Sequence, residues 1–278
     1  MNDDRALEAL LQWYLAAGAD EAIGEEPVDR FAETERRLAE RNSARAAPAP
    51  ARPASPPAAA PAVPAGPRLG PDSPATAIAE ARAAAMAATT VEELGRAVAA
   101  FEGCSLKHTA TNTVFADGNP LSRLMFIGEA PGADEDRIGR PFVGVSGQLL
   151  DRMLATIGLD RTSAYITNVL FWRPPGNRKP TEAEVAICRP FVERHIALVD
   201  PRLLIMVGGT ASAALVPGSA GITRLRGRWM ALEIPGLATP LQAMAMYHPS
   251  YLLRSPDRKR DAWADLLSIK SKNRTNPS

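Results

Sequence analysis

Five side chains of this sequence are of types that bind and react with a small planar ligand, and each lies beside a tight turn or a short apolar run. Glu129 and Glu135 flank a turn rich in glycine and proline, which brings backbone amides close to a ligand. Phe142 lies between glycine and proline turns ahead of a helical pattern, a position suited to stacking on a flat ring. Asn168 and His248 each follow an apolar run, and a buried asparagine there must satisfy both a donor and an acceptor.

Each of these residues also has a structural interpretation, which the residues alone leave open. The carboxylates can form the acidic first turn of a helix, and the phenylalanine can pack within its own loop. The asparagine can bond the local backbone instead of a nucleobase edge, and the histidine can be satisfied in the core. The sequence has neither a G-x-G-x-x-G fingerprint nor a P-loop, which disfavours a third interpretation, a nucleotide-dependent α/β enzyme.

Further groups after the apolar runs are suited to phosphates or to a base stack. They are Arg173, Arg178 and Lys179 after the second run, Gly209 and Thr210 after the third, and Leu252, Leu253 and Arg254 after the fourth. Basic side chains bind phosphate oxygens, and a glycine-rich helix start offers backbone amides to an anion. Exposed leucines beside a cation can wedge between bases.

These groups need a scaffold that gathers them, and the apolar runs supply one. Runs at 124–127, 165–170, 203–207 and 242–247 are strand-like, with helical patterns at 77–88, 90–101, 148–157, 182–199, 210–215 and 257–271. Strands that are apolar throughout and alternate with helices predict a three-layer α/β/α fold with a central four-stranded parallel sheet. In such sheets, sites form at the carboxyl ends of the strands, where these groups lie.

The chain divides by composition into four parts. Residues 1–43 are expected to form a short helical appendage, and the Pro/Ala-rich stretch 44–75 a disordered linker, because it cannot bury enough apolar surface. Residues 76–272 form the predicted body, and 273–278 a tail.

The net charge of +1 is unevenly distributed along the chain. Residues 1–45 are acidic, with 11 acidic and 6 basic side chains. The rest is mildly basic, which suits an anionic partner.

Other function classes are excluded by composition. Two cysteines cannot form a secreted disulfide framework or a four-cysteine metal site by themselves. No apolar run reaches the ~18 residues of a membrane span, and the acidic start is not a secretory signal. The expected location is the cytoplasm, at the nucleoid of a bacterium.

Taken together, these segments resemble the family-4 uracil-DNA glycosylases of bacteria and archaea. The match runs from about Gly103 to Leu267 and rests on six motifs that occur in order. They are GEAPGADED, GRPFVGVSGQLL, ITNV, RPPGNRKPT, the Gly-Gly after the third strand, and HPSYLLR. The resemblance implies a DNA repair enzyme that flips uracil out of DNA, hydrolyses its N-glycosidic bond and leaves an abasic site.

The resemblance also implies roles for single residues. Phe142 would stack on the extruded uracil, Asn168 would read its O4 and N3 edge, and His248 would contact O2. Glu129 and Glu135 would lie near the sugar and the attacking water, as catalytic groups beside His248. The remaining implied contacts are Ala130 in the base pocket, and Arg173, Arg178, Lys179, Gly209, Thr210, Ser250, Leu252, Leu253 and Arg254 on DNA.

The sequence departs from that family at its 4Fe–4S cluster. Cys104 and Cys188 stand at two of the four ligand positions, whereas Lys107 and Trp172 stand at the other two. Neither lysine nor tryptophan is a cluster ligand, so the sequence predicts that the cluster is lost and that no cofactor is used. A zinc site built from Cys104, His108, Cys188 and His195 and a Cys104–Cys188 disulfide are weaker alternatives.

Substrate range and partners follow as expectations. The small Ala130 admits a broader range that includes deaminated purines such as xanthine and hypoxanthine. A monomer acting on single- or double-stranded DNA is expected, with a protein partner for the N-terminal helices. The competing interpretation is a non-catalytic relic of the same fold that binds uracil or DNA; the complete set of polar residues favours the enzyme.

Overall fold

The computed structural model describes residues 73–216, 218 and 221–274. A mixed six-stranded sheet forms its centre, with the strand order β1-β3-β2-β4-β6-β5. The strands are β1 (Ala116–Gly118), β2 (Leu124–Gly128), β3 (Tyr165–Asn168), β4 (Leu203–Val207), β5 (Trp229–Leu232) and β6 (Leu241–Met246). The four inner strands are parallel, as predicted, and β1 and β5 pair antiparallel at the two edges. The sequence analysis missed both edge strands.

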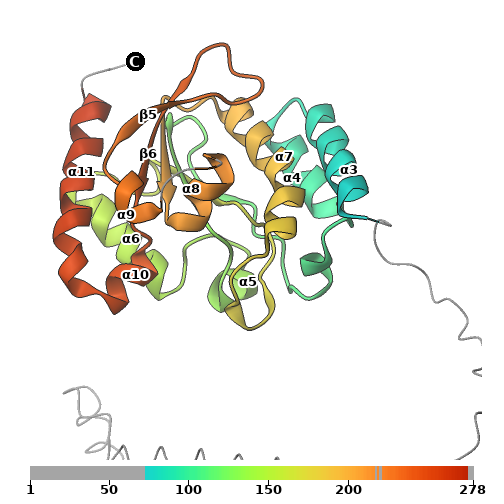
Figure 1. Ribbon diagram of the computed structural model, residues 1–278, viewed down its shortest axis with the longest axis horizontal. Coiled ribbons are helices and arrows are strands. Elements are labelled where there is room, and N and C mark those ends of the chain that lie inside the picture. Colours follow the sequence, from blue (N-terminus) through green and yellow to red (C-terminus); the bar gives the residue numbers. More distant parts are fainter. Residues whose placement is uncertain (1–72, 217, 219–220, 275–278) are drawn as a thin grey trace, which may run out of the picture. The chain divides into compact units, whose positions relative to one another are not determined.

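Helices cover both faces of this sheet (Figure 1). They are α3 (Pro74–Ala87), α4 (Val91–Ala100), α5 (Ala133–Ile138), α6 (Val145–Thr156), α7 (Glu182–Val199), α8 (Gly209–Leu215), α9 (Ile222–Leu225), α10 (Pro249–Arg254) and α11 (Lys259–Arg274). Short 3-10 turns occur at Ser105–His108, Pro175–Asn177 and Pro256–Arg258. The predicted helical appendage and most of the predicted linker and tail lie outside the described residues.

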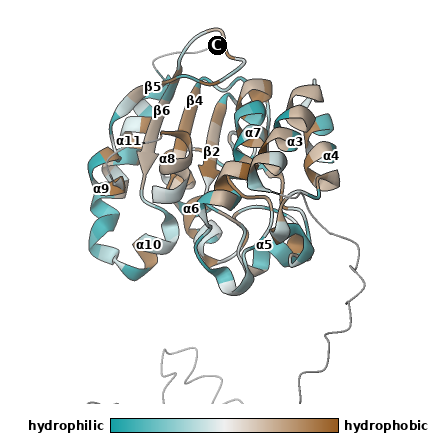
Figure 2. Ribbon diagram, turned by 45° about the vertical axis from the view of Figure 1, so that its right-hand side comes forward, coloured by the Kyte–Doolittle hydropathy of each residue, from teal (hydrophilic) through white to brown (hydrophobic). Residues whose placement is uncertain are grey.

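The inner strands are apolar throughout because both of their faces are buried. Along β2, Met125 and Ile127 face a core shared with α3, α4, α7 and α8, whereas Leu124 and Phe126 face a core shared with α6, α10 and α11. Figure 2 shows these strands as largely hydrophobic ribbons between helices that carry both hydrophilic and hydrophobic residues. The predicted three layers are therefore confirmed. No helix in the described ranges is long and apolar enough to cross a bilayer.

The register of the parallel strands brings their carboxyl ends together. Gly128 at the end of β2 pairs with Asn168 at the end of β3, and Val207 at the end of β4 pairs with Met246 at the end of β6. The turns that follow these strands must therefore meet along one edge of the sheet. This is the edge at which the chemically active residues of the sequence are collected.

A buried ion pair joins the segment before β5 to α11. Asp265 is 2% exposed and accepts hydrogen bonds from Arg226 at 2.9 Å from Nε and 2.5 Å from Nη2. Burial raises the pKa of Asp265, an effect that the Arg226 guanidinium partly offsets. The pair is thus a fixed structural contact between the segment before β5 and α11.

We expect Asp265→Ala to lower the free energy of unfolding by about 3 kcal/mol, because the largely buried Arg226 charge then keeps only a 3.9 Å ion pair with Asp261 and a hydrogen bond to its carbonyl. Urea denaturation measures the change. Asp257→Ala is the matched control, since the Asp257 side chain is 71% exposed and its ion pair with Arg258 lies on the surface. A loss at Asp265 no larger than that at Asp257 would contradict the prediction.

Candidate functional site

A pocket of about 610 Å³ opens at the carboxyl ends of the parallel strands. Of the residues singled out in the sequence, those that line it are Glu129, Ala130, Glu135, Phe142, Asn168, Arg178, Gly209, His248, Ser250 and Arg254. They come from the turns after β2, β3, β4 and β6 and from the loop before α6. Side chains that are far apart in the sequence therefore share one concave surface.

Asn168 ends β3 with its side chain in the pocket wall. The residue is 2% exposed, and within the described part of the chain its carboxamide makes no hydrogen bond. The interpretation in which the amide bonds the local backbone is therefore not what the structure has. A nearly buried amide with unused donor and acceptor groups is a ready site for the polar edge of a ligand.

Gly128 allows two pocket side chains to approach each other. A Cβ atom at this position would lie 2.4 Å from both the Asn168 Oδ1 and the Phe142 Cζ atoms. Any side chain at position 128 would therefore displace the amide, the ring or both. The sequence analysis did not single out Gly128, and its only signal was a glycine at the end of an apolar run.

Phe142 presents its ring to the pocket from a backbone that phenylalanine rarely adopts. Its φ is 55°, in the left-handed region, which costs a bulky residue on the order of 1–3 kcal/mol. The Phe142 ring lies 5.6 Å from that of His248, at an interplanar angle of 30°. The backbone of this loop also approaches α6 closely at Gly147. A Cβ atom on Gly147 would lie 1.7 Å from the Phe142 carbonyl oxygen. The surrounding structure holds this ring where it is.

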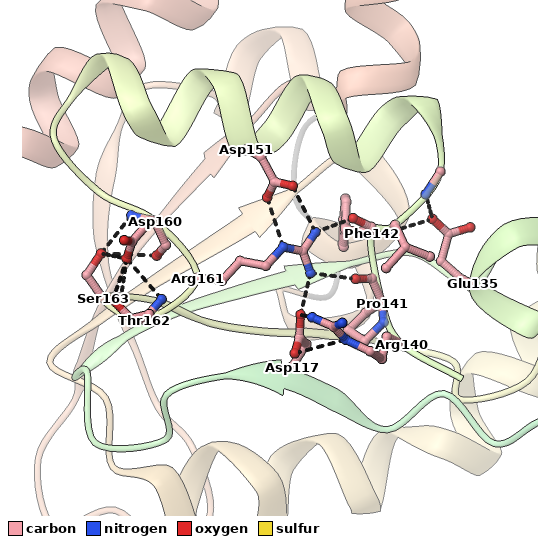
Figure 3. Close-up of polar contacts among 12 residues, drawn as sticks. Asp117, Glu135, Arg140, Pro141, Phe142, Asp151, Asp160, Arg161, Thr162 and Ser163 are labelled. Carbon is pink, nitrogen blue, oxygen red and sulfur yellow. Dashed lines mark hydrogen bonds and ion pairs between the residues drawn. The ribbon is translucent and has the colours of Figure 1, made fainter. Parts of the chain in front are cut away.

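Glu135 ties two loops of the site together. Its Oε1 accepts hydrogen bonds from the amides of Val143 at 2.9 Å and Gly144 at 2.8 Å, on the side of the loop before α6 (Figure 3). Its Oε2 accepts a hydrogen bond from the amide of Gly132 at 3.0 Å. The bond to Gly132 is the helix-capping contact that the structural interpretation of this carboxylate anticipates. Glu135 thus lines the pocket and caps α5 at the same time.

Glu129 differs from Glu135 in having no partner. Its carboxylate lies in the pocket wall, and among the described residues it makes neither a hydrogen bond nor an ion pair. Of the two predicted catalytic carboxylates, Glu129 therefore has free oxygen atoms that can face a ligand or a water molecule.

His248 is held in one tautomer by the start of α10. The amide of Ser250 donates to its Nδ1 at 3.1 Å, and the Ser250 hydroxyl lies 2.8 Å from the same atom. Because an amide can only donate, Nδ1 must be the acceptor, and the neutral ring carries its proton on Nε2. Burial, with a smaller contribution from the Arg254 charge, lowers the pKa of His248 to about 4. The ring is neutral at pH 7 and offers an N–H donor.

The residues predicted to contact DNA divide into free and engaged groups. Arg178 forms two hydrogen bonds to Glu184, at 2.9 and 2.6 Å, and Arg173 donates to the Asn177 side chain at 2.7 Å. Lys179 is exposed, and Thr210 lies in the first turn of α8 outside the pocket wall. The two arginines therefore stiffen their loop, whereas Lys179 is left exposed beside them.

The Leu-Leu-Arg segment does not present both leucines to solvent. Leu253 is 39% exposed, but Leu252 is 1% exposed and packs into the core formed with α6 and α11. The expectation of two exposed leucines is therefore corrected to one. The reason is that this segment is the short helix α10, in which successive side chains point in different directions.

The cysteines and histidines outside the pocket do not assemble into one site. Cys104 and Cys188 are both buried free thiols, and the neighbouring Cys188 lowers the pKa of Cys104. His195 instead bonds the Tyr165 hydroxyl at 2.9 Å and stacks on Phe115. No group of three histidine, cysteine or acidic side chains that could hold a metal occurs within the described residues.

Comparisons with known proteins give a family model and several relatives. The model of a family described as the uracil DNA glycosylase superfamily matches residues 115–267. A type-4 uracil-DNA glycosylase of Archaeoglobus fulgidus is 35% identical over 184 residues, which cover 65% of this chain and 92% of that protein. One of Thermotoga maritima is 38% identical over 174 residues, 60% of this chain and 86% of the relative. A DNA polymerase of Bacillus phage SP01 is 28% identical over 153 residues, 55% of this chain and 16% of the polymerase.

These relatives contradict the prediction that no cofactor is used, because type-4 uracil-DNA glycosylases carry a 4Fe–4S cluster. The side chains present fit such a group only in part. Cys104 and Cys188 supply two thiols, whereas Lys107 forms an ion pair with Glu102 and the Trp172 indole donates to the Thr113 hydroxyl at 3.0 Å. A cluster of this kind is held by four ligands, so the mechanism below takes no step through it.

We expect the His248 ring to be the Nε2–H tautomer at pH 7 and to titrate near pH 4, because the Ser250 amide occupies Nδ1 and burial disfavours the charged ring. Long-range ¹H–¹⁵N NMR of the ring nitrogens measures both properties. A ring protonated on Nδ1, or one that titrates near the usual 6.5, would contradict this account of the site.

Proposed function

Because the chain belongs to the uracil-DNA glycosylase superfamily and is a uracil-excising DNA repair enzyme, we propose that this pocket receives an extruded uracil and hydrolyses its N-glycosidic bond. One observation carries the proposal: an unpaired amide, an aromatic ring and a neutral imidazole N–H line the same pocket. Uracil is a flat ring with a polar edge, and it gains negative charge when the bond breaks.

Recognition begins with the base leaving the duplex, which costs a few kcal/mol and is least costly for a mispaired or single-stranded base. The Phe142 ring stacks on the extruded base and replaces the neighbours that it has lost. The Asn168 carboxamide accepts a hydrogen bond from N3–H and donates one to O4. Cytosine presents an acceptor at N3 and a donor at its amino group, so it mismatches an amide held in this orientation.

The chemistry places opposite charges at two ends of the substrate. As the bond between C1′ and N1 breaks, its electron pair moves to the uracil, whose O2 gains negative charge, while the sugar becomes oxocarbenium-like. The Nε2–H of His248 donates to O2 where this charge develops. The unpaired carboxylate of Glu129 stabilises the sugar, orients the water that attacks C1′ and accepts the proton that this water loses, while the electron pair of the broken bond leaves with the uracil anion. Glu135 holds the loops of Phe142 and Glu129 in place.

The DNA around the flipped base meets the rim of the pocket. Lys179 and Arg254 are cations suited to phosphates, with Arg173 and Arg178 on the same side, and the amides near Gly209 and Thr210 are suited to a phosphate oxygen. The exposed Leu253, which lies in α10 with Ser250, can enter the space that the base leaves.

We further propose that the protein acts as a monomer at the bacterial chromosome. Residues 1–43 are too acidic for DNA and suit a protein partner.

Base release from end-labelled oligonucleotides tests the proposal. We expect alkali-labile sites at a single uracil, and a loss of activity of about 10²–10³-fold in His248→Ala, because the donor to O2 is removed. His108→Ala is the matched control, since His108 is a histidine that does not line the pocket. Oligonucleotides with xanthine or hypoxanthine measure the substrate range. Intact protein that binds DNA without cleavage would favour the non-catalytic alternative.

We expect Gly128→Ala to lower the single-turnover rate of uracil release by about 10²-fold, because the new methyl group displaces the Asn168 amide and the Phe142 ring. Gly221→Ala is the matched control, since a Cβ atom there meets nothing within 4 Å and the backbone φ is −53°. Equal rates for the two variants would show that the close approach at Gly128 does not matter for catalysis.

A further inference from the structure

Arg161 lies behind the base pocket, in the connection between α6 and β3, and its side chain reaches the loop that carries Phe142. Figure 3 shows the guanidinium between Asp151 and Asp117, with Pro141 and Phe142 beside it. Arg161 does not line the pocket. Its contacts therefore act on the shape of the loop and not on the ligand.

The contacts use all five N–H groups of the guanidinium. Nη1 donates to the Pro141 carbonyl at 3.0 Å and to Asp117 at 2.5 Å. Nη2 donates to the Phe142 carbonyl and to Asp151 at 3.3 Å, and Nε donates to Asp151 at 3.0 Å. A lysine has only three donors on one atom and cannot reproduce this planar arrangement.

The two aspartates hold the guanidinium in position against the loop. Asp117 belongs to the edge strand β1 and is 16% exposed at its side chain, and it also binds Arg140. Burial raises the pKa of Asp117, but hydrogen bonds from Arg140 and Arg161 outweigh this effect and the pKa lies below its usual value. Asp151 projects from α6 and is more exposed. Arg161 therefore joins β1, α6 and the Phe142 loop.

The loop is held from its two sides by opposite charges. Arg161 binds the carbonyls of residues 141 and 142, and Glu135 binds the amides of residues 143 and 144. Between these contacts lies Phe142, in the left-handed conformation that phenylalanine avoids. Strained backbone persists where surrounding contacts over-determine it. The orientation of these peptide groups sets the direction of the Phe142 ring.

We propose that Arg161 is a positioning residue for base excision, which acts by holding the backbone of Phe142 so that its ring stacks on the extruded base. This inference rests on the proposed role of Phe142 in the pocket. It assigns a function to a residue that does not line the pocket.

A double-mutant cycle with Phe142→Ala tests the inference. The variants are Arg161→Lys, Phe142→Ala and the two combined, each assayed for single-turnover uracil release over a range of enzyme concentrations. Arg140→Lys is the matched control, because Arg140 binds the same Asp117 but neither loop carbonyl. The thermal midpoint of each variant is measured alongside.

We expect Arg161→Lys to reduce the maximal single-turnover rate by about 10–100-fold, as a misplaced ring would, and Arg140→Lys to change it less than about 3-fold. In the Phe142→Ala background, Arg161→Lys should have little further effect, because the ring that it positions is gone. Effects that multiply in the double variant would overturn the inference, since Arg161 would then act independently of Phe142.

Two further outcomes separate this inference from the function on which it rests. If Phe142→Ala cleaves as fast as the unaltered chain, the proposed role of Phe142 fails, and the inference falls with it. If Phe142→Ala is slow and Arg161→Lys is normal, the inference alone fails. If Arg161→Lys does not fold, Asp151→Asn replaces it in the same cycle, because this change weakens the contact between Asp151 and the guanidinium and leaves Arg161 in place. If Asp151→Asn still lowers the rate in the Phe142→Ala background, the inference is again overturned.

Discussion

The site depends first on the pairing of Gly128 with Asn168 at the ends of two neighbouring parallel strands. Backbone hydrogen bonds fix this register, and the missing side chain at Gly128 leaves room for the amide and for the Phe142 ring. The hydrophobic burial of the strands on both faces keeps the register in place, because a slip by one residue would turn each side chain to the opposite face. Recognition of the base is thus built on the same contacts that hold the core together.

Charged groups hold the loops around this framework. Glu135 binds amides of the turn after β2 and of the loop before α6, and Arg161 binds carbonyls of the same loop. Of the groups expected to act on the ligand, the side chains of Glu129 and Asn168 have no partner among the described residues, whereas His248 is oriented by the Ser250 amide and keeps Nε2–H for the ligand. Glu135 and Arg161 thus provide the shape of the pocket, and the free polar atoms of Glu129, Asn168 and His248 provide its chemistry.

The sequence predicted the central sheet because strands buried on both faces are continuous apolar runs. It missed β1, which is Ala-Asp-Gly and forms no such run, and it also missed β5, a half-buried edge strand, although Trp-Met-Ala-Leu is a short apolar run. The pocket residues were found through motifs at strand ends and through a family resemblance. Leu252 was misplaced because a short helix was not recognised. Arg161 was missed because its partners are scattered along the chain. Asp117 lies 44 residues before it, Pro141 and Phe142 lie 20 and 19 residues before it, and Asp151 lies 10 residues before it on α6.

The unpaired amide of Asn168 has a consequence for the choice of ligand. Although Asn168 is 2% exposed, its amide atoms are not among the fully buried unpaired atoms of the described residues, which are His195 Nδ1 and Arg202 Nε, so water in the pocket can reach them. An entering base must therefore exchange hydrogen bonds with water for hydrogen bonds with the amide. A base whose edge does not match leaves the amide without either, which is a cost that only the wrong ligand bears.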